Sequence, residues 1–123
     1  MSGRIQITAA DILVVADIED TPTAALLLES LPIQASANTW GDEIYFSILV
    51  DVDAADPREV VEMGDLGYWP PGSAFCIFFG PTPASRGDEI RPASPVNVFG
   101  RVEGDPRVFK RVASGELVRL ERA

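Results

Sequence analysis

Short segments in which polar and apolar residues alternate recur along the whole chain, and this pattern restricts the possible folds more than any other feature. Residues 4–8 (RIQIT), 44–48 (IYFSI) and 95–102 (PVNVFGRV) show it most clearly. A period of two is typical of β-strands with one buried face. Further strand-like stretches lie at residues 11–18, 33–39, 60–63, 67–71, 74–79 and 116–121, with Gly, Pro, Asn or Asp turns between most of them.

Two segments have the marks of helices instead. Residues 22–31 follow Thr21, a suitable N-cap, begin with Pro22 and carry apolar side chains at helical spacing. Residues 106–113 begin after Asp105, which can cap a helix in the same way. Two helices are too few to connect about eight strands into a parallel sheet. We therefore expect a mainly β protein: a closed, antiparallel, eight-stranded β-barrel capped by two short α-helices, about 22–31 and 106–113.

The inventory of side chains excludes several kinds of site. The chain has 123 residues, which we expect to form a single domain (1–123), and it contains no histidine and one cysteine, Cys76. Ser-His-Asp and Cys-His catalysis are therefore excluded, as are an intrachain disulfide and a zinc site made of His or Cys ligands. Asp51, Asp53 and Asp56 form an acidic stretch, but Ala55 stands where a calcium loop needs a ligand. We expect no metal and no cofactor.

Charge and hydropathy give expectations about partners and location. The net charge is −9, and the few basic residues are scattered, which argues against binding to nucleic acid or to anionic membranes. No apolar run approaches the ~20 residues that a membrane-spanning helix needs. The first residues, MSGRIQIT, lack a signal-peptide pattern. We expect a cytoplasmic protein.

Three motifs in the second half of the chain resemble the cyclophilins, in the same order and at similar spacing: SAFCI (73–77), PTP (81–83) and VFGRV (98–102). Longer stretches are more similar still to a family of small prokaryotic cyclophilin-like proteins of unknown function. These are NTWGDEIYF (38–46), GDLGYWPPGSAFCIFFGPTP (64–83) and RPASPVNVFG (91–100). The resemblance covers nearly the whole chain. It implies an eight-stranded barrel with two helices, in agreement with the alternation pattern.

The resemblance does not extend to the catalytic groups of cyclophilins, which isomerise X-Pro bonds with an arginine beside a hydrophobic pocket for the proline ring. The histidine of that pocket aligns at or near Val96, and one of its phenylalanines aligns with Cys76. The arginine would fall in the strand at residues 43–47, which contains none. These departures argue against prolyl isomerase activity.

Half of the aromatic residues gather in residues 67–79, namely Tyr68, Trp69, Phe75, Phe78 and Phe79. Neighbouring residues of a strand face opposite sides, so Phe75, Ile77 and Phe79 share one face, while Cys76 and Phe78 share the other. Tyr68 and Trp69 are divided in the same way. The resemblance places Phe75 inside the barrel, so Cys76 and Phe78 would lie toward the substrate groove of cyclophilins. Alternatively, all five aromatic residues belong to the core or lie under a loop at residues 80–92.

Several polar residues stand inside apolar motifs, where they either line a small-molecule site or make structural contacts. In the structural alternative, Asn97 and Ser94 tie the long loop to the barrel, and Glu43 pairs with Arg91. In the functional alternative they belong to one ligand-binding groove. The candidate groove residues are Trp40, Glu43, Tyr45, Tyr68, Trp69, Cys76, Phe78, Thr82, Arg91, Ser94 and Asn97.

The leading hypothesis is a non-catalytic module that binds a small molecule or a peptide. One alternative is a weak or divergent peptidyl-prolyl cis-trans isomerase. Another is an accessory subunit of a metabolic enzyme, because cyclophilin-like domains also resemble parts of proteins associated with oxoprolinase and urea amidolyase. A homo-oligomer is left open.

Overall fold

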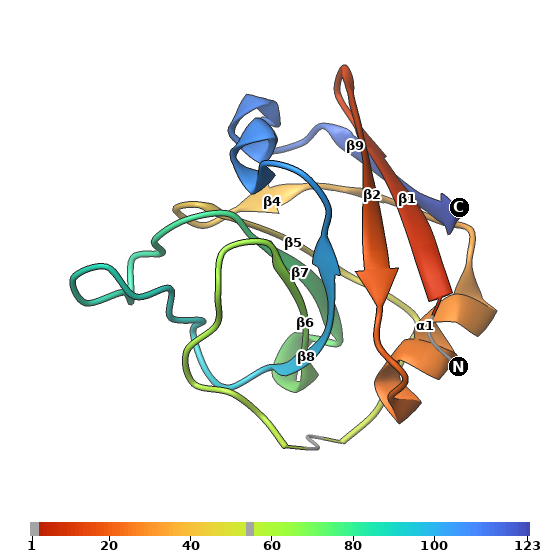
Figure 1. Cartoon of the computed structure of the whole chain (residues 1–123), viewed down its shortest axis with the longest axis horizontal. Coiled ribbons are helices and arrows are strands. Elements are labelled where there is room, and N and C mark those ends of the chain that lie inside the picture. Colours follow the sequence, from red (N-terminus) through yellow and green to blue (C-terminus); the bar gives the residue numbers. More distant parts are fainter. Residues whose placement is uncertain (1–2, 54–55) are drawn as a thin grey trace.

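The computed structural model describes residues 3–53 and 56–123, and within them nine antiparallel strands form a nearly closed barrel (Figure 1). The mainly β barrel expected from the alternation pattern is confirmed. The strands are β1 (Gly3–Ala9), β2 (Ile12–Ile18), β3 (Ile33–Ser36), β4 (Asn38–Thr39), β5 (Glu43–Ser47), β6 (Asp65–Trp69), β7 (Ala74–Phe78), β8 (Asn97–Val102) and β9 (Leu117–Arg122). The ninth strand arises because residues 33–39 form two strands, with a break at Ala37.

That break is also where the barrel closes. The strand order is β3-β9-β1-β2-β8-β6-β7-β5-β4, so the two outermost strands of the sheet are β3 and β4. They are consecutive pieces of one chain segment, which pairs with β9 through β3 and with β5 through β4. The buried Ala37 between them donates its backbone N–H to the carbonyl of Glu116 at 2.8 Å. Closure of this kind leaves little exposed sheet edge.

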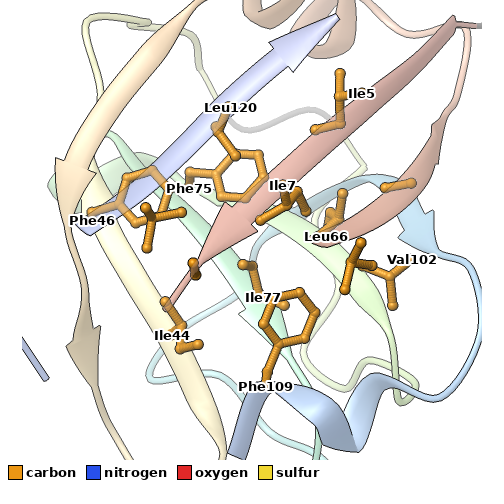
Figure 2. Packing of buried hydrophobic residues seen from close by; sticks show 14 of the residues in the cluster. Ile5, Ile7, Ile44, Phe46, Leu66, Phe75, Ile77, Val102, Phe109 and Leu120 are labelled. Carbon is orange, nitrogen blue, oxygen red and sulfur yellow. The ribbon is translucent and has the colours of Figure 1, made fainter. Parts of the chain in front are cut away.

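The interior of the barrel is filled by the inward-facing residues of the strands (Figure 2). Phe75 is fully buried, stacks on Phe46 with ring centroids 5.2 Å apart and meets Phe99 edge-on at 5.6 Å. Ile77 and Phe79 belong to the same cluster, so the predicted core face of residues 74–79 is confirmed.

Two helical segments cover opposite ends of the barrel in the view of Figure 1. Helix α1 spans Pro22–Ser30, and its buried Ala24 and Leu27 confirm the predicted apolar stripe. The second segment, η2 (Pro106–Arg111), is a 3-10 helix rather than the expected α-helix. The 3-10 helix is the tighter form and is used mainly in short pieces, so this six-residue segment is a long example of it. A further short 3-10 turn, η1, covers Pro70–Gly72.

Replacing Thr21 by alanine is expected to lower the free energy of unfolding by about 1 kcal/mol. The Thr21 hydroxyl oxygen accepts a hydrogen bond from the backbone N–H of Ala24 at 3.1 Å, which satisfies one of the free donors at the start of α1. Urea denaturation measures the change, and Ser114→Ala, at an exposed position outside the helices and strands, is the control. Equal stability of the two variants would contradict a stabilising cap.

One predicted strand, at residues 60–63, is wrong. The described residues 56–63 make only two isolated bridges, Arg58 with Val96 and Val61 with Ile90. Residues 54–55, and with them part of the acidic stretch 51–56, lie outside the described residues.

None of the helices in the described part of the chain is long and apolar enough to cross a membrane.

Candidate functional site

The outer face of β7 is covered by a second layer of chain. Cys76 and Phe78 are directed away from the barrel interior, as predicted, but they are 2% and 0% exposed. They pack in a separate apolar cluster with Val61, Ala74, Ile90 and Val96. The isolated bridges join the two segments of this cover, because Val61 donates its backbone N–H to the carbonyl of Ile90 at 2.9 Å. The outer layer therefore comprises residues 58–61 and 90–96.

Packing between this layer and the barrel is tight. A Cβ atom at Gly67 of β6 would lie 3.0 Å from Val96 and 3.2 Å from the ring of Phe78. A larger residue here would require Val96 or Phe78 to shift by a few tenths of an ångström, so glycine suits this close approach of the outer layer to the sheet. Cys76 and Phe78 are thus covered and present no surface of their own.

Beside this covered face of β7 lies an open cavity of about 250 Å³. Four of the predicted groove residues line it, namely Trp40, Glu43, Tyr45 and Trp69, together with Pro92, Ala93 and Val96. We call this cavity the Trp40–Trp69 pocket. Its lining is apolar apart from the Glu43 carboxyl, the Tyr45 hydroxyl and the indole N–H groups.

Strand periodicity and a turn bring the four predicted residues together. Glu43 and Tyr45 are two residues apart on β5, so they share its outer face, while Ile44 and Phe46 enter the core. Trp40 begins the turn into β5 and donates its backbone N–H to the carbonyl of Glu43 at 2.9 Å. Trp69 is the last residue of β6.

The loop that forms the opposite wall is anchored by hydrogen bonds. Ser94 accepts a hydrogen bond from the indole N–H of Trp69 at 2.6 Å, so Ser94 ties the loop to the barrel, as the structural alternative proposed. Thr82 donates through its hydroxyl to the carbonyl of Arg91 and through its backbone N–H to Ser85 at 2.9 Å. These contacts place Thr82 and Ser94 in the support of the loop.

Glu43 has an unusual electrostatic environment. Its side chain lies in the pocket wall, 6% exposed, and this burial raises the pKa of the carboxyl to about 7, although a hydrogen bond with the Cys76 thiol acts in the opposite direction. Burial, and then the nearby Glu43, raise the pKa of the Cys76 thiol well above its ordinary value, so this thiol stays protonated. The predicted pairing of Glu43 with Arg91 is wrong, because Arg91 forms its ion pair with Glu89 at 2.6 Å.

Two predicted groove residues lie elsewhere. Tyr68 is fully buried in the barrel core, where its hydroxyl donates to the carbonyl of Val50 at 2.7 Å. Asn97 is buried and donates through its side-chain amide to the carbonyl of Asp53 at 3.2 Å. This hydrogen bond ties the 49–53 segment to the barrel, whereas the sequence suggested that Asn97 ties the 80–92 loop. Among residues 3–53 and 56–123, no three Cys, Asp or Glu side chains are placed to hold a metal ion.

Sequence reasoning missed three lining residues: Pro92, Ala93 and Val96. Val96 carried a usable signal, because it aligns with the pocket histidine of the cyclophilins. No sequence pattern indicated Pro92 and Ala93, because their position in the pocket wall depends on how the loop folds back onto the barrel.

The three positions that align with the catalytic groups of cyclophilins lie close together in the structure. Val96 lines the pocket, strand β5 contributes Glu43 and Tyr45, and Cys76 pairs with Tyr45 across the β5–β7 ladder. The pocket therefore occupies the region where the alignment places the proline pocket of cyclophilins, with Glu43 on the strand that would carry their arginine.

Comparisons with known proteins agree with the fold. A search among curated proteins finds no match. Among solved structures, the chain is similar to a hypothetical protein from Archaeoglobus fulgidus, known from a solution structure. The two are 43% identical, with a TM-score of 0.83, and the match covers 99% of this chain and 95% of that one. The family model described as Cyclophilin-like matches residues 3–121, and this chain accordingly belongs to the Cyclophilin-like family.

Proposed function

We propose that this protein binds a small organic molecule or a single side chain of a peptide in the Trp40–Trp69 pocket, without catalysing prolyl isomerisation. The observation that carries the proposal is the pocket itself: three aromatic side chains and one buried carboxyl around an open cavity of about 250 Å³. Apolar walls with few polar groups are typical of small-molecule sites. The volume lies below the ~300 Å³ at which drug-sized sites begin, so it suits a small group.

Catalysis is disfavoured by what replaces the cyclophilin groups. The side chain of Val96 cannot donate a hydrogen bond or transfer a proton, and the strand that would carry the arginine of cyclophilins brings the carboxyl of Glu43 to the pocket instead of a positive charge. Arg91 is the arginine nearest in sequence to the pocket residues Pro92 and Ala93, and its guanidinium is held by Glu89. The fold alone does not confer the activity.

The placement of the two tryptophans makes the binding proposal easy to test. The chain contains two tryptophans, and both line the pocket, so every indole signal reports on it. A panel of small neutral, anionic and cationic organic molecules is titrated while the two indole N–H resonances are followed by NMR. We expect at least one chemical class to shift both resonances and to raise the melting temperature.

The matched variants are Trp69→Leu and Leu117→Ala, the second at an exposed apolar position away from the pocket. The first is expected to weaken binding at least about tenfold, because Trp and Tyr side chains carry much of the binding energy in such sites. The second should bind as the wild type does. A panel in which neither indole resonance moves would reject the proposed function.

An isomerase assay tests the catalytic alternative. We expect X-Pro peptides mixed with the protein to relax at the uncatalysed rate, over tens to hundreds of seconds at 25 °C. Acceleration that disappears in Trp69→Leu would instead show a divergent isomerase acting at this pocket.

A further inference from the structure

We propose that the Trp40–Trp69 pocket accepts the alkylammonium group of a small organic cation, such as a trimethylammonium group. This inference rests on the proposed function and specifies the class of ligand. It follows from three properties of the lining: its aromatic faces, its single carboxyl and its lack of any basic side chain.

The aromatic part of the lining suits a methylated ammonium group. Trp40, Tyr45 and Trp69 are three of the seven lining residues. The π-faces of such rings carry negative charge density and attract cations, and Trp does so most strongly. A methylated ammonium group is also apolar at its surface, so it loses less hydration than a primary ammonium when it enters an apolar cavity. Aromatic cages use this combination to bind quaternary ammonium groups.

The charge of the site has the sign that such a ligand needs. Glu43 is the carboxyl of the lining, and Pro92, Ala93 and Val96 bring no charged group from the loop. The whole chain carries a net charge of −9, which favours the approach of cations over anions. An anionic ligand would meet both the Glu43 carboxylate and this overall field.

A bound cation would also offset the cost of ionising Glu43. The carboxyl titrates near neutral pH because burial disfavours its charged form. A cation in the pocket interacts much more favourably with the charged form of the carboxyl than with the neutral form, so binding should strengthen as Glu43 ionises. The titratable groups around it are the Cys76 thiol from β7 and the Tyr45 phenol from β5, while β6 and the loop contribute the uncharged Trp69, Pro92, Ala93 and Val96.

The test compares choline with 3,3-dimethylbutan-1-ol, which has the same shape but carbon in place of the charged nitrogen. Tryptophan fluorescence of the intact protein is titrated with each compound at pH 8, against a NaCl blank of equal ionic strength. We expect choline to bind about a hundredfold more tightly than the alcohol at pH 8, with about tenfold from the desolvated cation–π contacts and about tenfold from the ionised Glu43. Since about one tenth of Glu43 is ionised at pH 6 and about nine tenths at pH 8, choline should bind about tenfold more weakly at pH 6.

Glu43→Gln keeps the shape of the side chain and removes its charge. We expect this variant to lose about tenfold in choline affinity and to lose the pH dependence of choline binding. Glu29→Gln, which changes an exposed carboxyl on α1, is the matched control and should leave all affinities unchanged.

The outcomes separate the two proposals. Equal binding of choline and the alcohol, or binding of neutral compounds alone, would overturn the cation inference and leave the pocket as a binding site. An unchanged choline affinity in Glu43→Gln would likewise overturn it. If neither these two compounds nor the wider panel changes the indole signals, the binding function itself fails.

Discussion

Phe78→Ala is expected to lower the free energy of unfolding by about 3–5 kcal/mol, the usual cost of truncating a buried phenylalanine. Phe78 faces away from the barrel interior, and a residue in an open groove would cost far less. It is nevertheless 0% exposed, because Val61, Ile90 and Val96 cover it. The variant loses the transfer free energy of the ring and leaves a cavity between two rigid layers that cannot collapse fully.

Urea denaturation of the wild type, Phe78→Leu and Phe78→Ala measures the effect. The leucine variant retains part of the side chain, so a graded loss is expected even if the alanine variant does not fold. Leu49→Ala is the control, because Leu49 is fully exposed and surface substitutions change stability by about 0.5 kcal/mol or less. If Phe78→Ala behaves like this control, the outer layer does not pack on β7 in solution.

The second large effect is a loss of stability with rising pH, caused by Glu43. In the unfolded chain this carboxyl has its ordinary pKa of 4.5, and in the folded protein about 7. Between these values the folded state holds more protons than the unfolded state, so the free energy of unfolding falls as pH rises. The contribution is fully present below pH 4.5 and is lost as pH passes through about 7. The total is about 3 kcal/mol, since each unit of pKa difference corresponds to about 1.4 kcal/mol.

Glu43→Gln isolates this contribution. The variant is expected to be about as stable as the wild type at pH 4.5 and up to about 3 kcal/mol more stable at pH 8. Urea denaturation at a series of pH values measures the difference, and Glu29→Gln corrects for the change of net charge. A constant difference between Glu43→Gln and the wild type across this range would contradict an elevated pKa for Glu43.

Much of the barrel follows from local patterns. Alternation located the strands around residues 4–8, 44–48 and 95–102, and Thr21 with Pro22 marked the start of α1 to the residue. The strict two-residue period of a strand also separated Phe75 and Ile77 from Cys76 and Phe78 correctly. These features depend on a few neighbouring residues, so they can be predicted from a single sequence.

The sequence predicted only part of the candidate site. Four of its seven lining residues were among the predicted groove residues, since aromatic and polar side chains in apolar motifs are unusual enough to notice. Tyr68 was placed in the groove although it lies in the core, because a tyrosine with its hydroxyl bonded to a core carbonyl looks the same in a sequence as one facing solvent. The pKa of Glu43 also had no local signal.

The sequence by itself determined most of the strands, which side chains of a strand share a face, and that His-based chemistry is excluded. Only the tertiary structure decided what covers the outer face of β7, how the break at Ala37 closes the barrel and which residues meet at the pocket. The physical reason is the range of the interactions. A strand shows alternating polar and apolar residues when only one of its faces is buried. Every residue of β7 is buried, because other segments of the chain cover both of its faces. Its sequence is therefore apolar throughout and does not show whether the outer face is open or covered.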